Sequence, residues 1–84
     1  MTIEELYQKL CALGIPEHRY YLNGVFGSKD DNEKIALKIE GKHFLDYEVS
    51  YKERGEIHIL RKFLDRDDAF SFFIEKLVEE RKLF

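Results

Sequence analysis

Three histidines and one cysteine are the residues of this chain that most often carry metal or nucleophilic chemistry. His18, His43 and His58 are scattered along the 84 residues, without the i, i+4 spacing that places two ligands on one face of a helix. Cys11 falls on the apolar side of an expected helix, where no neighbour in the sequence would lower its pKa. We therefore expect surface histidines, a small core cysteine, no metal site and no cofactor.

Adjacent carboxylates are the other residues that could take part in acid–base chemistry. Examples are Asp30-Asp31 and Asp67-Asp68, and neighbouring exposed acids are most often solvated loop or helix-cap charges. The segment Gly24-Val25-Phe26-Gly27 lacks the strand, helix and lysine that surround a phosphate-binding loop. The sequence therefore predicts that the protein is not an enzyme.

Length and composition limit the class of protein to which this chain can belong. The chain is long enough for one domain, spanning residues 1–84, and its 44% hydrophobic and 37% charged residues exclude a disordered chain. No apolar run is long enough for a transmembrane helix or a signal-peptide core. One cysteine excludes an intrachain disulfide. We expect a soluble, cytoplasmic protein that has no membrane partner.

The charge balance narrows the expected partners. Fourteen basic against seventeen acidic residues give a net charge of −3, and no segment has the basic stripe that binds nucleic acid. A basic protein is the better-matched partner.

The first expected element is a helix over residues 3–13. Thr2 and Glu5 have the spacing of a capping box. Gly14 provides the left-handed residue that ends a helix, Ile15 can fold back on the last turn, and Pro16 cannot continue it.

From residue 17 the apolar period changes from 3.6 to 2, which indicates strands. Residues 23–32 have little periodicity and are expected to form a long exposed loop. Tight turns are expected at Gly41-Lys42 and at residues 52–55, where Gly55 takes the conformation that other residues avoid. The expected strands are 20–22, 34–40, 45–51 and 57–63.

The last expected element is a helix capped by Asp65, with Asp67 and Asp68 in its first turn. Phe72 points about 160° away from the apolar stripe of this helix, beside Leu83. The two side chains are expected either to be covered by the open end of the sheet or to form an interaction patch. The stripe itself consists of Phe70, Phe73, Ile74, Leu77 and Val78. The expected fold class is α+β in the order αββββα, a four-stranded antiparallel meander with both helices on one face.

Residues 46–55 (DYEVSYKERG), followed by Phe63 and by Asp68-Ala69-Phe70, form a pattern that can be compared with known families. Over about residues 20–78 the chain resembles the small immunity proteins of bacterial polymorphic-toxin systems, closest to the immunity protein 59 family. It departs from that family at Tyr47 (usually Trp), Ser50 (usually Tyr), Phe70 (commonly Cys) and an apparent insertion over residues 25–31.

The resemblance implies an antitoxin: a non-enzymatic protein that binds a cognate secreted toxin domain, such as a nuclease, and blocks its active site. The net negative charge suits a basic toxin. The alternative is a small non-enzymatic adaptor or homodimerising domain that pairs through a sheet edge or through Phe72.

The acidic loop and the acidic helix cap are the expected partner-binding surface, acting together by electrostatic steering. The alternative is that the loop only solubilises the chain and the aspartates only stabilise the last helix. Arg54 lies in the most family-like tripeptide, Glu53-Arg54-Gly55; the alternative is that it only satisfies the turn carbonyls or pairs with Glu53. The candidate partner-binding residues are Asp30, Asp31, Glu33, Arg54, Asp65, Asp67, Asp68 and Phe72.

Overall fold

Two α-helices, one short 3-10 helix and five strands make up the part of the chain that the structure describes. In this computed structural model, the backbone is described over residues 1–82 and the side chains over residues 1–80. The elements, in chain order, are α1 (Ile3–Ala12), η1 (Glu17–Arg19), β1 (Tyr20–Leu22), β2 (Phe26–Gly27), β3 (Ile35–Glu40), β4 (Asp46–Glu53), β5 (Glu56–Phe63) and α2 (Arg66–Lys82).

Both ends of α1 are set by local hydrogen bonds. The Thr2 hydroxyl accepts from the Glu5 N–H at 3.2 Å, and the Glu5 carboxylate accepts from the Thr2 N–H at 3.0 Å. Gly14 has φ 76°, and the Ile15 N–H donates back to the Leu10 carbonyl at 3.1 Å. The capping box and the glycine stop predicted from the sequence are confirmed.

The sheet is mixed, with the strand order β2-β1-β3-β4-β5, so the predicted four-stranded antiparallel meander is wrong. Asn23 and Gly24 both have positive φ (50° and 72°), and the Val25 N–H closes the turn on the Leu22 carbonyl at 3.0 Å. This turn forms a hairpin, and the expected loop therefore contains β2. Because β2 reverses the chain, β3 starts at the same end as β1 and pairs with it in parallel.

Strands β3, β4 and β5 form the predicted antiparallel ladders, with one irregularity in β5. Val49 faces Arg61 while Ser50 faces Ile59, so Leu60 is an extra residue, a β-bulge. The bulge shifts the alternation of side chains along β5. Simple alternation over 57–63 places Ile57, Ile59 and Phe63 on one face, with Leu60 opposite; because of the bulge, Ile57 and Ile59 lie on the face opposite to Phe63.

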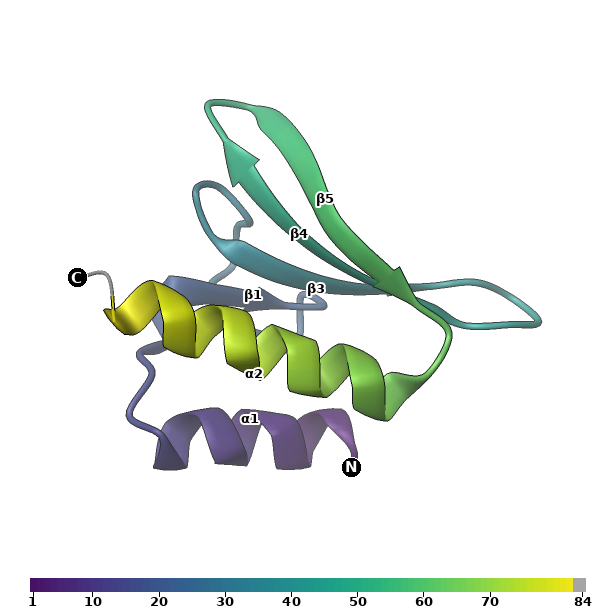
Figure 1. Cartoon of the computed structure of the whole chain (residues 1–84), viewed down its shortest axis with the longest axis horizontal. Coiled ribbons are helices and arrows are strands. Elements are labelled where there is room, and N and C mark those ends of the chain that lie inside the picture. Colours follow the sequence, from purple (N-terminus) through teal and green to yellow (C-terminus); the bar gives the residue numbers. More distant parts are fainter. Residues whose placement is uncertain (83–84) are drawn as a thin grey trace.

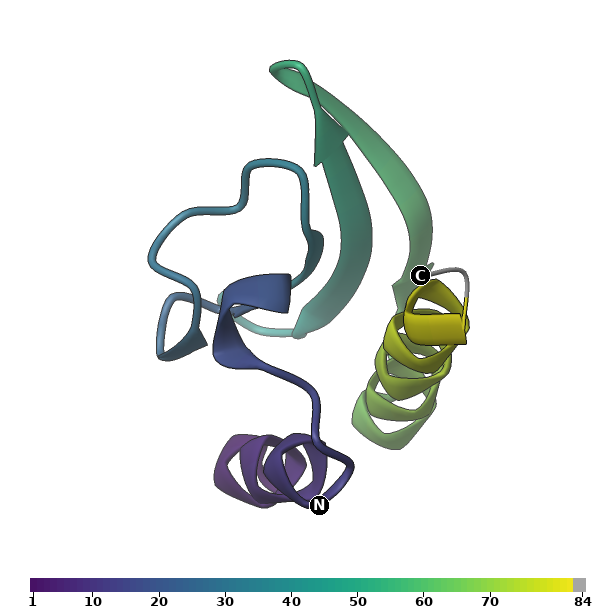
Figure 2. The same cartoon turned by 90° about the vertical axis from the view of Figure 1, so that its left-hand side faces the viewer.

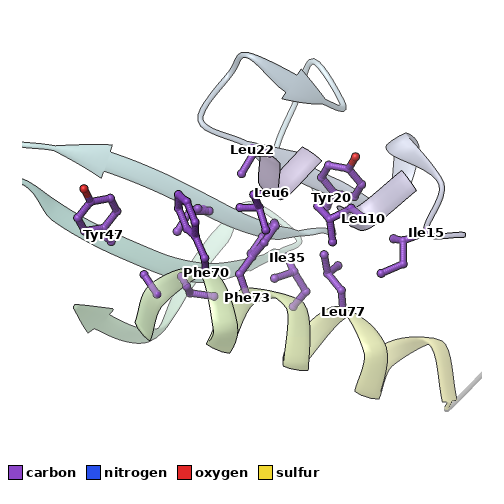
Figure 3. Packing of buried hydrophobic residues seen from close by; sticks show 13 residues of the cluster. Leu6, Leu10, Ile15, Tyr20, Leu22, Ile35, Tyr47, Phe70, Phe73 and Leu77 are labelled. Carbon is purple, nitrogen blue, oxygen red and sulfur yellow. The ribbon is translucent and has the colours of Figure 1, made fainter. Parts of the chain in front are cut away.

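The helices cover one side of the sheet and enclose the core (Figures 1 and 2). The ring of Tyr7 on α1 stacks on Phe26 at 4.4 Å between centroids. Tyr20 and Tyr47 meet α2 edge-on, each with its ring centroid 6.2 Å from that of a phenylalanine. The buried cluster, most of it labelled in Figure 3, comprises Leu6, Leu10, Ile15, Tyr20, Leu22, Ile35, Leu37, Tyr47, Val49, Ala69, Phe70, Phe73 and Leu77.

Candidate protein-binding surfaces

The histidines are exposed and lie on separate elements: His18 in η1, His43 between β3 and β4, and His58 on β5. Within the described residues, no three His, Cys, Asp or Glu side chains could hold a metal ion together. Cys11 is exposed, so its predicted place in the core is wrong. It follows the fully buried Leu10, and one residue turns a helix by about 100°, enough to carry Cys11 off the buried stripe.

Residues 28–34 fold over the face of the sheet that the helices leave open. In Figure 2 this loop lies on the far side of the sheet from α2. Asp31 accepts a hydrogen bond from Lys38 Nζ at 2.8 Å and pairs with Lys52 Nζ at 3.5 Å. Only 19% of its side chain is exposed. The expectation of an exposed, unattached Asp31 is therefore wrong, since the carboxylate joins the loop to two strands.

Asp30 and Glu33, the other acids of this loop, remain exposed. Asp30 accepts from the Asn32 N–H at 3.2 Å and from Lys34 Nζ at 2.8 Å, so it organises its own turn. Glu33 has φ 55°, and its N–H donates to the Lys52 carbonyl at 2.7 Å. Both carboxylates are therefore accessible to a partner: Asp30 while it keeps its hydrogen bonds within the turn, and Glu33 because only its backbone is hydrogen-bonded.

We expect Asp31→Asn to lower the free energy of unfolding by about 1–2 kcal/mol at neutral pH, because two lysines lose their anion. The hydrogen bond from Lys38 holds the pKa of Asp31 below its ordinary value. A lowered pKa stabilises the fold above the unfolded-state value of about 3.9 and ceases to do so as pH falls through the folded-state pKa. Urea unfolding at pH 7 and at pH 3 measures this difference.

The matched control for this variant is Asp46→Asn, at an exposed aspartate that begins β4. It should change the free energy of unfolding by less than about 0.5 kcal/mol at either pH. An equal loss of stability in Asp31→Asn at pH 3 and at pH 7 would contradict the assignment to a charged pair.

The acidic start of α2 is occupied with structural contacts. Asp65 caps the helix by accepting from the Asp68 N–H at 2.9 Å, as predicted. Asp67 faces the amino group of Met1 at 3.5 Å. Asp68 is exposed in the first turn, where the helix dipole favours negative charge.

The two acidic groups do not form one surface. Only the last residues of the loop reach the C-terminal half of α2, where Asn32, Glu33 and Lys34 line a cavity together with Glu80. The aspartates occupy the opposite end of the helix, roughly 20 Å away at 1.5 Å per residue. The loop and the cap are therefore two separate surfaces, at opposite ends of α2.

Arg54 lies at the exposed tip of the β4–β5 hairpin. Arg54 and Gly55 have φ 51° and 83°, the two positive angles of a tight hairpin turn. The prediction for Gly55 is confirmed, and the left-handed arginine is an additional finding. No hydrogen bond or ion pair joins the Arg54 side chain to another described residue, so its guanidinium is available to a partner.

Phe72 does not point into solvent. Its ring centroid lies 5.3 Å from that of Phe63 on β5, and Arg61 and Lys76 place their cationic groups over its face at 6.0 Å and 5.1 Å. Of the two alternatives predicted for Phe72, the first is therefore confirmed: the end of β5 covers its ring. Its predicted neighbour Leu83 lies outside the described residues.

The sequence suggested a sheet edge only for the alternative function and did not say which strand; in the structure the long free edge is β5. This strand of eight residues ends the sheet and is exposed along nearly all its length. An antiparallel neighbour engages alternate residues, so half of its backbone N–H and C=O groups face outward. Ile57, Ile59 and Leu60 are 51%, 52% and 42% exposed along it. The alternation of Ile57 and Ile59 in the sequence predicted a strand but not which face would be covered.

A groove opens beside this edge, between the β4–β5 hairpin and the C-terminal half of α2. Two adjoining cavities of about 420 and 470 Å³ share Tyr51 and Glu80. We call them together the Tyr51 groove. Glu33 was predicted to bind a partner and lies on its wall; Tyr51, Glu53 and Glu80 are lining residues that sequence reasoning missed.

These elements define the protein as a small two-layer α+β domain with a five-stranded mixed sheet. Comparison with family models, with curated proteins and with solved structures found no match for the chain. Among the described helices, none is both long and apolar enough to cross a membrane.

Proposed function

We propose that this chain is an immunity protein, a non-enzymatic antitoxin of the cytoplasm that binds a toxin domain and blocks its active site. The proposal follows the resemblance of residues 46–55 and their surroundings to the immunity protein 59 family. The β5 edge is the observation from the structure that supports it best.

The β5 edge suits a protein partner because it combines open backbone groups with apolar side chains. An extended segment of another protein can add to such an edge as a further strand, and side chains on both faces then give specificity. Leu64, which follows β5, is 79% exposed. Buried apolar area of this kind drives protein association. The opposite edge offers only the two residues of β2.

Charge supports the same kind of partner. The chain carries a net charge of −3, and complementary charge speeds association with a basic protein. The exposed Asp30 and Glu33 carboxylates lie on the loop side of the domain and add to this potential.

The test uses the toxin candidate that the proposal implies, the C-terminal domain of a large secreted protein encoded next to this gene. We expect that domain to stop the growth of a bacterial host and co-expression of this chain to restore it. In a direct binding measurement, the double variant Ile57→Lys/Ile59→Lys should weaken the complex at least about tenfold. The matched control is Val25→Lys, at a 61% exposed residue beyond the opposite edge.

The binding measurement and the growth assay can each fail separately. Growth arrest that this chain does not relieve, with no detectable complex, would refute the antitoxin function. Equal binding by the wild type and the β5 double variant would leave the antitoxin function standing and would show that the toxin does not bind at the β5 edge.

The β5 edge also favours the second candidate, a homodimerising adaptor in which two copies pair edge to edge. Light scattering after size exclusion distinguishes the candidates. A dimer that Ile57→Lys/Ile59→Lys converts to a monomer, together with no binding to the neighbouring toxin domain, would favour the adaptor.

A further inference from the structure

The Tyr51 groove has an apolar floor and a polar rim. Ile35, Tyr51 and Leu60 provide the apolar surface of its larger cavity. In Figure 2 this end of the molecule faces the viewer, with η1, the β4–β5 hairpin and the end of α2 around it. An occupant must therefore combine an apolar body with a polar or charged end.

The charges on the rim of the Tyr51 groove indicate whether the charged end of the occupant is positive or negative. Its cations already face carboxylates at ion-pair distances: Arg19 and Glu80 at 3.6 Å, Lys76 and Glu79 at 3.2 Å, Lys34 and Asp30 at 2.8 Å. Glu33 and Glu53 also line the groove, and neither forms an ion pair with any described residue. Among the described residues, these two carboxylates on the rim are therefore left without a cation.

Tyr51 reports this excess of negative charge at the centre of the groove. Burial raises the pKa of its hydroxyl, and the carboxylates of Glu53, Glu33 and Glu80 raise it further. These three acids belong to β4, to the loop before β3 and to α2, so separate elements converge on one aromatic ring.

A cationic side chain fits these features better than other ligands. Its aliphatic stem can lie on the apolar floor while its charged end meets the carboxylates. Arginine suits the groove better than lysine, because its planar guanidinium stacks on an aromatic ring and binds carboxylates with two parallel hydrogen bonds. An anionic ligand would face the carboxylates of Glu33 and Glu53, which have no cation beside them among the described residues.

We propose that the Tyr51 groove receives an arginine side chain of the protein partner, with its stem on Ile35 and Leu60 and its guanidinium between Glu33 and Glu53. The inference rests on the proposed function for the identity of the partner. A contact on the β5 edge and an arginine in the groove can be made by one partner, because Leu60 belongs to both surfaces.

The groove is tested first without any toxin, using N-acetyl-arginine methylamide as the probe. We expect saturable chemical-shift changes at the backbone amides of Glu33, Tyr51 and Leu60 in NMR titrations at low salt. The double variant Glu33→Gln/Glu53→Gln should weaken binding of the probe by at least about fivefold. The controls are the probe N-acetyl-norleucine methylamide, which lacks the charge, and Glu40→Gln, at an exposed glutamate at the end of β3.

Equal shift changes with the arginine and norleucine probes, or equal arginine affinity in the wild type and in Glu33→Gln/Glu53→Gln, would overturn the proposal. The toxin domain then separates this inference from the proposed function. A toxin that binds the wild type and this double variant equally well refutes the groove and leaves the antitoxin standing. A toxin that binds neither protein, while the arginine probe binds the wild type, refutes the antitoxin and leaves the groove as a site for another basic protein.

Discussion

Gly27→Ala is expected to lower the free energy of unfolding by about 3–5 kcal/mol, from backbone strain and overpacking together. A Cβ atom at this position would lie 2.6 Å from the Tyr20 carbonyl oxygen and 2.7 Å from its ring, at φ 80°. The ring is fully buried and cannot move aside, and the same carbonyl accepts from the Ser28 N–H at 2.8 Å. Chains of this length have free energies of unfolding of roughly 4–13 kcal/mol. Urea unfolding of the variant should therefore show that most of the stability of the fold is lost.

Gly55→Ala is the matched control, because it makes the same change at nearly the same φ. Gly55 has φ 83°, and a Cβ there would meet nothing within 4 Å. We expect a loss of only about 1–2 kcal/mol, the cost of a left-handed non-glycine residue. Similar losses of stability in the two variants would contradict this prediction. They would show that the β1–β2 hairpin accommodates a Cβ atom beside Tyr20 and that the left-handed backbone alone causes both losses.

Phe73→Ala is expected to cost about 3–5 kcal/mol, because it removes a fully buried ring and leaves a cavity. Phe73 is 0% exposed, and its ring meets Tyr20 edge-on where the helices and the sheet join. The measurement is again urea unfolding, with circular dichroism to show whether the variant still folds.

The control for the core variant is Phe44→Ala, which deletes the same ring from the loop between β3 and β4. Phe44 is 83% exposed, and we expect a change within about 0.5 kcal/mol. A small effect of Phe73→Ala, comparable to that of Phe44→Ala, would contradict the packing of α2 on the sheet.

Elements that depend on neighbouring residues could be predicted from the sequence. Thr2 and Glu5 started α1, Gly14 ended it, and Asp65 capped α2, because each contact spans five residues or fewer. The buried stripe of α2 followed equally from helical spacing, with Phe70, Phe73 and Leu77 in the core.

The sheet could be predicted only in part, because its topology depends on two local features that compete with simple alternation. Asn23-Gly24 is a strong hairpin sequence, but β2 beyond it has only two residues and no alternating pattern to reveal it. The bulge at Leu60 likewise leaves no mark in the sequence, since it depends on pairing with β4.

The candidate site was predicted least well, because a carboxylate has the same appearance in the sequence whether or not a cation lies beside it. Asp31 forms ion pairs with Lys38 and Lys52, which belong to strands that follow it in the chain. Glu33 forms no ion pair with any described residue. The Tyr51 groove depends on loop, strand and helix meeting in three dimensions, and nothing in their separate sequences indicates that they do.

The parallel pairing of β1 with β3 also determines the order in which the sheet can assemble during folding. Glu53 pairs with Glu56 three positions along the chain and Glu40 with Asp46 six positions along, whereas Tyr20 must find Ile35 fifteen positions away. The entropy lost in closing a loop grows with its length, and a long loop must close before its contacts contribute. The β3–β4–β5 hairpins are therefore the kinetically accessible half, and β1 with its helix docks onto a surface that they have already formed.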